Sequence, residues 1–250
     1  MAEALSAALA AEGLGWLVFA AFVAGLVRGF AGFGTAMIYM PVAASVLPPV
    51  WALTTMMAFD VIGPLPNVPR ALRDGRRRDI FLLGLGALIA LPLGVFVLTR
   101  LPVAPFRWAV SAISLFLLVL LILGWRYRGV LSRRMILAVG GMGGALAGST
   151  GLAGPPVIML YMAGRSASRE IRANITLYLL LTDVLMLGVF ALNGILEAVP
   201  VTIGLLLAPV YLLGNVVGGR LYRPDAERLY RVIAYVIIAV SALSALPLFD

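Results

Sequence analysis

The chain of 250 residues contains no cysteine, no histidine and no lysine. Without thiolate or imidazole side chains it cannot form His/Cys zinc sites, histidine-ligated haem, disulfides or catalytic triads with a histidine base. Charge is also scarce: 12% of the residues are charged, against about a quarter in a typical soluble domain. The sequence therefore predicts a protein that is not an enzyme and has no metal and no cofactor.

Apolar residues make up 62% of the chain. Residues 80–99 and 135–164 carry no charge at all, and apolar stretches of about 18 residues or more are typical of membrane spans. The chain is thus predicted to be an all-α integral membrane protein whose main partner is the lipid bilayer. In a membrane protein, the net charge of +8 indicates which connections face the cytoplasm. It does not indicate a nucleic-acid partner.

The arginines predict how the chain crosses the membrane. Sixteen of the nineteen lie in four connections, at residues 67–79, 125–134, 164–172 and 220–231. The other connections hold only Arg100 and Arg107. The positive-inside rule places the four basic connections in the cytoplasm and both termini outside. Arg28 is left over, inside an apolar stretch.

This topology requires residues 135–164 to enter and leave on one side. Thirty residues would make one helix of about 45 Å, too long for a hydrocarbon core of about 30 Å, whereas two full spans need about 40 residues. The segment GSTGLAGPP (148–156) supplies a bend, which favours a re-entrant helical hairpin. Residues 13–47, with GFAGFG (29–34) at the centre, are interpreted in the same way. One long kinked helix is the alternative for each.

The two halves repeat each other. Three glycines precede three others by 119 residues: Gly25, Gly29 and Gly32 against Gly144, Gly148 and Gly151. A second set is shifted by 120 residues: Gly84, Gly94 and Arg100 against Gly204, Gly214 and Arg220. We predict two inverted repeats, each a hairpin followed by three transmembrane helices. The first repeat (1–125) has hairpin 13–47 and spans 51–66, 80–99 and 106–125; the second (126–250) has hairpin 135–164 and spans 173–193, 199–219 and 229–249.

Inverted repeats are typical of secondary transporters, whose sites form near the membrane centre where interrupted helices meet. The second arms are expected to begin near Thr35 and Pro155. Helix N-termini there would offer backbone N–H groups and partial positive charge to an anion. The predicted substrate-binding residues are Arg28, Gly29, Gly32, Gly34, Thr35, Gly148, Ser149, Thr150, Gly151, Gly154 and Pro155.

Arg28 has two interpretations. Its guanidinium matches an oxyanion through paired hydrogen bonds, or it forms an ion pair with a carboxylate such as Asp60. Asp60 and Asp183 each lie in the first full span of a repeat and are the predicted proton-coupling residues, with a neutral, hydrogen-bonded aspartate as the alternative. Four asparagines could serve the same interior or join helices: Asn67, Asn174, Asn193 and Asn215.

Two segments resemble the sulfite exporter TauE/SafE-like family: GLVRGFAGFGTAMIYMP (25–41) and GALAGSTGLAGPPVIMLYM (144–162). The ALPLG pattern at 90–94 adds to the resemblance, which extends over essentially the whole chain. It implies export of sulfite or a small organosulfur anion across the bacterial inner membrane without ATP hydrolysis. The leading prediction is a proton-coupled secondary transporter that works by alternating access. An anion channel with the same hairpins is the alternative.

Overall fold

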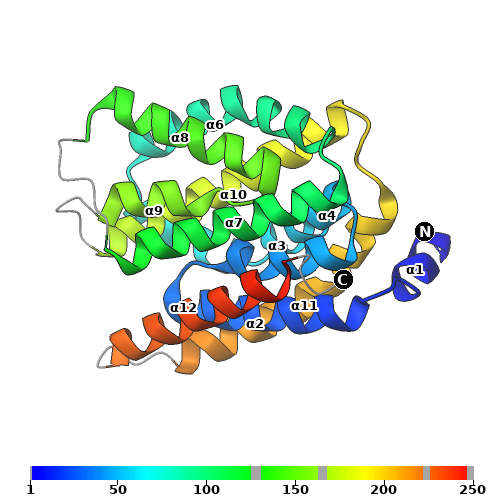
Figure 1. The fold of residues 1–250 in the computed structure, drawn as a ribbon. Coiled ribbons are helices and arrows are strands. Elements are labelled where there is room, and N and C mark those ends of the chain that lie inside the picture. The colour runs from blue at the N-terminus through cyan, green and yellow to red at the C-terminus, as the bar shows by residue number, and fades with distance from the viewer. Residues whose placement is uncertain (1, 125–130, 163–167, 222–225, 247–250) are drawn as a thin grey trace.

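The computed structural model describes residues 2–124, 131–162, 168–221 and 226–246, and every regular element among them is a helix (Figure 1). The elements are α1 (Ala2–Leu9), α2 (Leu14–Ala31), α3 (Thr35–Val46), α4 (Pro49–Asp60), η1 (Leu65–Asn67), α5 (Val68–Asp74), α6 (Arg77–Leu98), α7 (Val103–Ile122), α8 (Arg133–Thr150), α9 (Gly154–Met162), α10 (Ser168–Leu192), α11 (Ala198–Leu221) and α12 (Glu227–Ser244).

Five of these helices, α2, α6, α7, α10 and α11, are long and apolar enough to cross a membrane. A helix of 18 residues, the length of α2, rises about 27 Å. Large apolar side chains on the long helices point outward, for example Phe81 and Ile89 on α6 and Leu213 on α11. Exposed apolar surface of this extent fits lipid and not water, as expected for an integral membrane protein.

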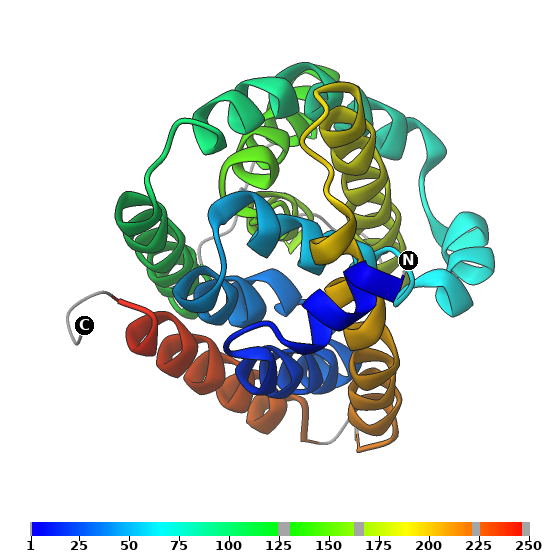
Figure 2. The same cartoon turned by 90° about the vertical axis from the view of Figure 1, so that its right-hand side faces the viewer.

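The shorter helices form the centre of the molecule. Every residue is buried from 52 to 60 in α4 and from 151 to 161, which includes most of α9. Figure 2 shows α3 and α4 in the middle of the bundle, surrounded by longer helices that include α2, α7, α11 and α12. The apolar faces of the long helices therefore enclose two short helices that each follow a break in the chain, α3 and α9.

Both predicted helix breaks are present. The first lies between α2 and α3, where Gly32 has φ +80° and Gly34 has φ +104°. The second follows α8, where Gly151 has φ +79°. Positive φ is the region that glycine adopts without steric cost. The N–H of Gly32 bonds to the carbonyl of Arg28, and that of Gly151 to the carbonyl of Ala147. These pairs are 119 residues apart, as the repeat predicts.

The second arms begin close to the predicted residues, α3 at Thr35 and α9 at Gly154. The two hairpins run over Leu14–Val46 and Arg133–Met162, so the predicted last residues of the second hairpin (163–164) lie outside the described part. Each first arm, α2 or α8, has 18 residues and is longer than the arm that follows. Their re-entry into a membrane stays a prediction.

The predicted span 51–66 is wrong in its C-terminal half. The helix α4 has 12 residues and ends at Asp60; a turn, η1 and α5 follow. Gly63, Pro64 and Pro66 explain this, because proline removes a helix hydrogen bond and clashes with the preceding turn. Asp60 consequently lies at a helix end, whereas Asp183 lies within the 25 residues of α10. The two aspartates are not equivalent.

The other predicted spans differ from the helices by a few residues at their ends. The observed bounds are Arg77–Leu98 for 80–99, Val103–Ile122 for 106–125, Ser168–Leu192 for 173–193, Ala198–Leu221 for 199–219 and Glu227–Ser244 for 229–249. Residue 125 and residues 247–249 lie outside the described part. The helix α1 lies before the first predicted hairpin, where the sequence predicted no helix.

The repeated glycines lie where helices approach most closely. Helix α2 packs along α11, and α8 packs along α6. A Cβ on Gly214 would lie 2.3 Å from the carbonyl oxygen of Phe22, and one on Gly148 would lie 2.5 Å from that of Leu91. Small residues permit this approach of backbones in membranes. The first arm of each hairpin thus packs on the helix that corresponds to the second predicted span of the opposite half, α11 for α2 and α6 for α8.

Replacing Gly218 with alanine is expected to lower the thermal stability of the purified protein. The new Cβ would lie 2.0 Å from the carbonyl oxygen of Leu26, so α2 and α11 must separate, at a cost of at least about 1–3 kcal/mol. Gly188→Ala is the matched control, because nothing lies within 4 Å of a Cβ there. The midpoint of thermal unfolding in detergent measures both; equal midpoints for the two variants would contradict the α2–α11 contact.

Candidate functional site

Arg28 lies in the last turn of α2 and is 8% exposed. Its Nη1 donates to Asp60 Oδ2 at 3.1 Å and to Thr35 Oγ1 at 3.3 Å. These partners sit at the end of α4 and the start of α3. The ion pair that the sequence offered as one interpretation of Arg28 is therefore present in the structure.

Tyr211 of α11 completes this arrangement. Its hydroxyl donates to Asp60 Oδ1 at 2.6 Å and lies 3.1 Å from Thr35 Oγ1. Since the tyrosine proton goes to the carboxylate, the threonine hydroxyl donates to the tyrosine oxygen. Arg28, Thr35, Asp60 and Tyr211 form a closed ring of hydrogen bonds, called the buried ring below. Both oxygens of Asp60 are engaged, which is what a buried ion pair needs to offset its desolvation.

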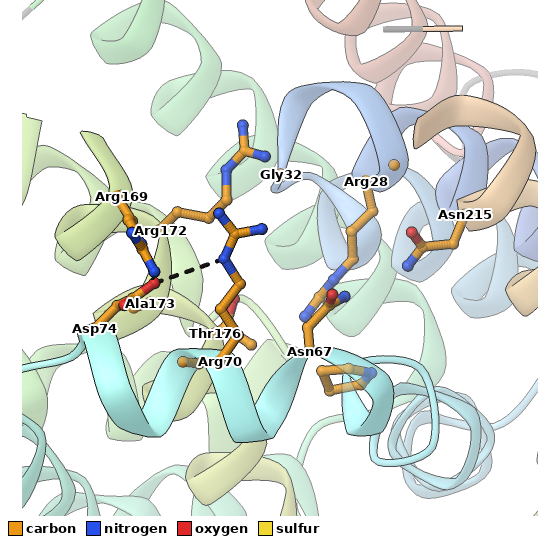
Figure 3. Close-up of a pocket in the computed structure, with 13 residues that line it drawn as sticks. Arg28, Gly32, Asn67, Arg70, Asp74, Arg169, Arg172, Ala173, Thr176 and Asn215 are labelled. Atoms are coloured by element: carbon orange, nitrogen blue, oxygen red, sulfur yellow. Dashed lines mark hydrogen bonds and ion pairs between the residues drawn. The ribbon is translucent and has the colours of Figure 1, made fainter. Parts of the chain in front are cut away.

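A pocket of about 380 Å³ adjoins the buried ring at Arg28. We call it the arginine pocket. Figure 3 shows it between α2, α5 and α10, with four arginine side chains around it. It is lined by Arg28, Gly29, Gly32, Pro64, Asn67, Arg70, Ala71, Asp74, Arg169, Arg172, Ala173, Thr176 and Asn215.

Positive charge dominates the arginine pocket. Asp74 is the only carboxylate among the described lining residues, and it pairs with Arg70 (Nε to Oδ2, 3.7 Å) and with Arg169. Arg172 forms no ion pair or hydrogen bond with any residue that the structure describes. These three arginines are exposed, while Arg28 is buried. The pocket therefore leads from an exposed basic mouth to a buried guanidinium, a distribution that concentrates anions.

Helix geometry explains how α10 contributes to the pocket. Arg169, Arg172, Ala173 and Thr176 follow the i, i+3, i+4, i+7 spacing that lines one face of a helix. Across from them, α5 packs on α10 through three buried apolar side chains: Ala71, Ala173 and Leu177.

Two polar contacts hold the start of α6 to α10. Arg76 Nε lies 2.6 Å from Glu170 Oε1, and the backbone N–H of Arg76 donates to Asn174 Oδ1 at 2.8 Å. Together with the apolar contact, they fix the position of Arg70 and Asp74 opposite Arg169.

Two glycines of α2 shape the other wall. A Cβ on Gly29 would lie 2.3 Å from the backbone carbonyl oxygen of Asn215, so glycine allows α11 to bring Asn215 to the pocket. A Cβ on Gly32 would lie 3.6 Å from Arg172 Nε, which places the Arg172 side chain directly beside the helix break.

Of the predicted substrate-binding residues in the first half, three line the pocket: Arg28, Gly29 and Gly32. Thr35 belongs to the buried ring. Gly34 lies beside the apolar side chains of Val27 and Ile238. The first half of the predicted site thus gathers around Arg28.

The predicted residues of the second half lie elsewhere. The hydroxyls of Ser149 and Thr150 bond to backbone carbonyls one turn back, at Ala145 (2.8 Å) and Leu146 (2.9 Å). Pro155 is buried in α9. The glycines contact other helices: Gly148 packs on Leu91, Gly151 lies beside Met40 and Met56, and Gly154 lies near Leu179. None of the six lines the arginine pocket.

Asp183 differs from Asp60. It is 7% exposed, yet among the described residues no hydrogen bond or ion pair reaches it. It lies close enough to Asp60 and Arg28 for their charges to interact. Within the part of the chain that the structure describes, no group of three or more acidic residues could hold a metal ion.

Sequence reasoning missed several pocket residues. Arg70, Arg169 and Arg172 had been interpreted only as cytoplasmic loop charges, and Tyr211 had not been considered. The i, i+3, i+7 spacing of Arg169, Arg172 and Thr176 is a signal that could have revealed the α10 face. Asn67 and Asn215 do face the interior site, whereas Asn174 and Asn193 bond to backbone groups.

Comparison with known proteins adds to this geometry. A family model described as Sulfite exporter TauE/SafE matches residues 17–245. Comparison of the chain with curated proteins and with solved structures gives no match. The family match runs from within α2 to just past the end of α12 and therefore includes both helix breaks, the buried ring and the arginine pocket. The chain accordingly belongs to the sulfite exporter TauE/SafE family of membrane transporters.

Proposed function

We propose that this protein is a secondary transporter that carries sulfite or a small organosulfur anion across the bacterial inner membrane by alternating access. One observation carries the proposal. The arginine pocket runs from three exposed arginines to the buried Arg28, at a break between two helices. Guanidinium groups bind oxyanions through paired hydrogen bonds, and broken helices are where transporters bind their substrates.

Alternating access requires two halves that rock against each other, and the packing supports such halves. The first arm α2 packs on α11 of the other half, and α8 packs on α6 in return. We take residues 1–125 and 126–250 as inverted repeats related by a pseudo-two-fold axis. The buried ring joins them, because Tyr211 is the one member from the second half.

The direction of the helices supports the proposed topology. Figure 1 shows that α7 and α11 end, and α8 and α12 begin, at the left end of the bundle, while α1 lies at the opposite end. The basic residues at those helix ends are Arg133, Arg134, Arg220, Arg228 and Arg231. We propose that this end faces the cytoplasm, with both termini outside.

We further propose that transport is coupled to protons through Asp183. Near the buried ring, one guanidinium (Arg28) interacts with two carboxylates, Asp60 and Asp183. Asp60 has partners for both oxygens, so Asp183 carries the uncompensated charge. An unpaired charge inside a membrane is costly, and a proton on Asp183 removes it. Asp60 then holds Arg28 in position, and Asp183 carries the proton. The two aspartates, which the sequence predicted as a proton-coupling pair, thus have different roles in this proposal.

Purified protein in proteoliposomes tests the proposal. We expect uptake of radiolabelled sulfite without ATP and accumulation above the outside concentration when a proton gradient is imposed. The alternative anion channel would equilibrate sulfite but never accumulate it, and its flux would ignore the pH gradient. Absence of anion uptake for sulfite and for a panel of organosulfonates would overturn the proposed function.

A further inference from the structure

The arginine pocket carries an excess of positive charge that the family assignment does not explain. Arg28 is matched by Asp60, and Arg70 and Arg169 share Asp74. Arg172 is matched by no carboxylate among the described residues. Among the described residues that line the pocket or pair with its arginines, four guanidinium groups thus face two carboxylates, and with a proton on Asp183 two positive charges remain.

The excess positive charge lies inside the arginine pocket, where it can interact with a bound anion. The pocket's inner wall, Arg28, is buried, and Arg172 lies beside the helix break at Gly32. Charges near a protein surface interact through an effective dielectric constant of about 20, which is lower than that of bulk water. Each additional charge on a ligand within about 6 Å of an arginine therefore contributes a larger interaction energy than it would in bulk water. Exposure of the other arginines allows salt to weaken the effect without removing it.

Neutral groups in the pocket suit the oxygen atoms of such a ligand. Asn67, Thr176 and Asn215 line it beside the arginines, and their amide and hydroxyl groups are hydrogen-bond donors. The volume of about 380 Å³ lies within the range of small-molecule sites. Among its described residues, the pocket therefore offers many hydrogen-bond donors, an excess of two positive charges and one lining carboxylate, Asp74, which already pairs with Arg70 and Arg169.

We infer that the arginine pocket selects doubly charged oxyanions over singly charged ones of the same shape, with Arg172 as the residue that sets this preference. The inference deepens the proposed function, on which it rests, by naming the charge of the substrate that the same pocket takes. A singly charged anion leaves one positive charge of the pocket unmatched, and a doubly charged one leaves none.

A simpler reading attributes the arginines to the membrane topology alone. In that case every arginine of the connections would contribute alike and would attract all anions without regard to their charge. Arg73 separates the two readings. It is an exposed arginine on α5, three residues from Arg70, but it does not line the pocket.

Sulfate and perchlorate are the first pair of probes, because both are tetrahedral and they differ in charge. Their affinities are measured by thermal shift and calorimetry on the purified protein, at constant ionic strength and in a neutral detergent that keeps anionic lipid headgroups away. We expect sulfate to bind at least about tenfold more tightly than perchlorate. Arg172→Gln should reduce that ratio at least about threefold, and Arg73→Gln should leave it unchanged.

Sulfite and chlorate are the second pair, both pyramidal, and should show the same order. Equal affinities within a pair, tighter binding of the singly charged member, or no binding of either doubly charged anion would overturn the inference. A preference that persists in full in Arg172→Gln would overturn the role of Arg172. Both pairs are measured by binding, without transport. A charge preference without transport would contradict only the proposed function. Transport of both members of a pair with equal apparent affinity would contradict only the inference.

Discussion

Replacing Arg28 with alanine should abolish anion transport, with a loss of at least about a hundredfold, since a charge-assisted, bidentate contact would be removed from the innermost wall of the pocket. The same change removes the partner of Asp60, whose Oδ2 accepts from Arg28 Nη1 at 3.1 Å. Breaking a buried ion pair costs about 3–5 kcal/mol, because the remaining charge is left uncompensated. The single variant is therefore expected to lose both transport and part of its folded yield.

A double variant separates these two effects. Arg28→Gln combined with Asp60→Asn removes both charges and leaves amide groups that can still bond to Thr35 and Tyr211. We expect its thermal unfolding midpoint to recover most of the loss seen in the single variant, since replacing a whole ion pair is far less costly than breaking it. Its transport should stay at background. Wild-type flux in the double variant would exclude a required role of Arg28.

Arg28→Lys refines the same test. Lysine keeps the positive charge for Asp60 but lacks the planar fork that binds an oxyanion through two parallel hydrogen bonds. Stability should remain close to that of the wild type while oxyanion affinity falls. Arg73→Gln, outside the pocket, is the control for a general effect of arginine loss.

The breaks in the fold could be predicted from local physics. Gly32, Gly34 and Gly151 adopt positive φ, where other residues are strained, and their positions in the sequence were sufficient to place both breaks. Repeated glycines also lie at the contacts of α2 with α11 and of α8 with α6, a packing that the sequence analysis did not predict. Gly29 and Gly148 both lie at such helix contacts, and of the two only Gly29 also lines the arginine pocket, so the repeat spacing alone does not identify the lining residues.

The extent of α4 was harder to predict. Residues 51–66 are mostly apolar, with Asp60 as the one charged residue, and were predicted to form one span. Pro64 and Pro66 end the helix early instead, which turns the following residues into α5 and moves Arg70 and Asp74 to the mouth of the pocket. Proline is tolerated inside other helices of this chain, at Pro92 and Pro209, so its effect depended on the tertiary context.

The site itself needed the tertiary structure. Arg28, Arg70 and Arg172 come from three helices, and no sequence spacing indicates that they meet. The distribution of the arginines along the sequence was interpreted only as a membrane topology. The same side chains can satisfy the positive-inside rule and also line a pocket, so this interpretation left their role in the site unrecognised. Tyr211 sits 151 residues from its partner Asp60, with no local pattern that distinguishes it from other tyrosines.

Replacing Asp183 with asparagine should uncouple transport from pH. With Asp183 ionised, its negative charge near Arg28 offsets one of the two positive charges of the arginine pocket and weakens the attraction for an anion; with a proton on Asp183, both positive charges remain. Wild-type transport should therefore rise as the pH falls. Asparagine mimics the protonated form at every pH, so the variant should transport with a flat pH profile and fail to accumulate sulfite in a proton gradient.

The two aspartates should also differ in stability. Asp60→Asn removes the acceptor of Arg28 and Tyr211 and is expected to lower the unfolding midpoint by several degrees, as loss of about 3 kcal/mol does in a domain of this size or larger. Asp183→Asn removes an unpartnered buried charge and should leave the midpoint equal or higher. Glu197→Gln, at an exposed position, is the control for loss of one carboxylate.

Proton-driven accumulation measured in proteoliposomes decides between the two carboxylates. If Asp183→Asn still concentrates sulfite in response to a pH gradient, Asp183 does not carry the proton. Loss of accumulation in Asp60→Asn alone would assign coupling to the buried ring. We favour Asp183, because both oxygens of Asp60 already accept hydrogen bonds from Arg28 and Tyr211, whereas Asp183 has no such contact with the described residues.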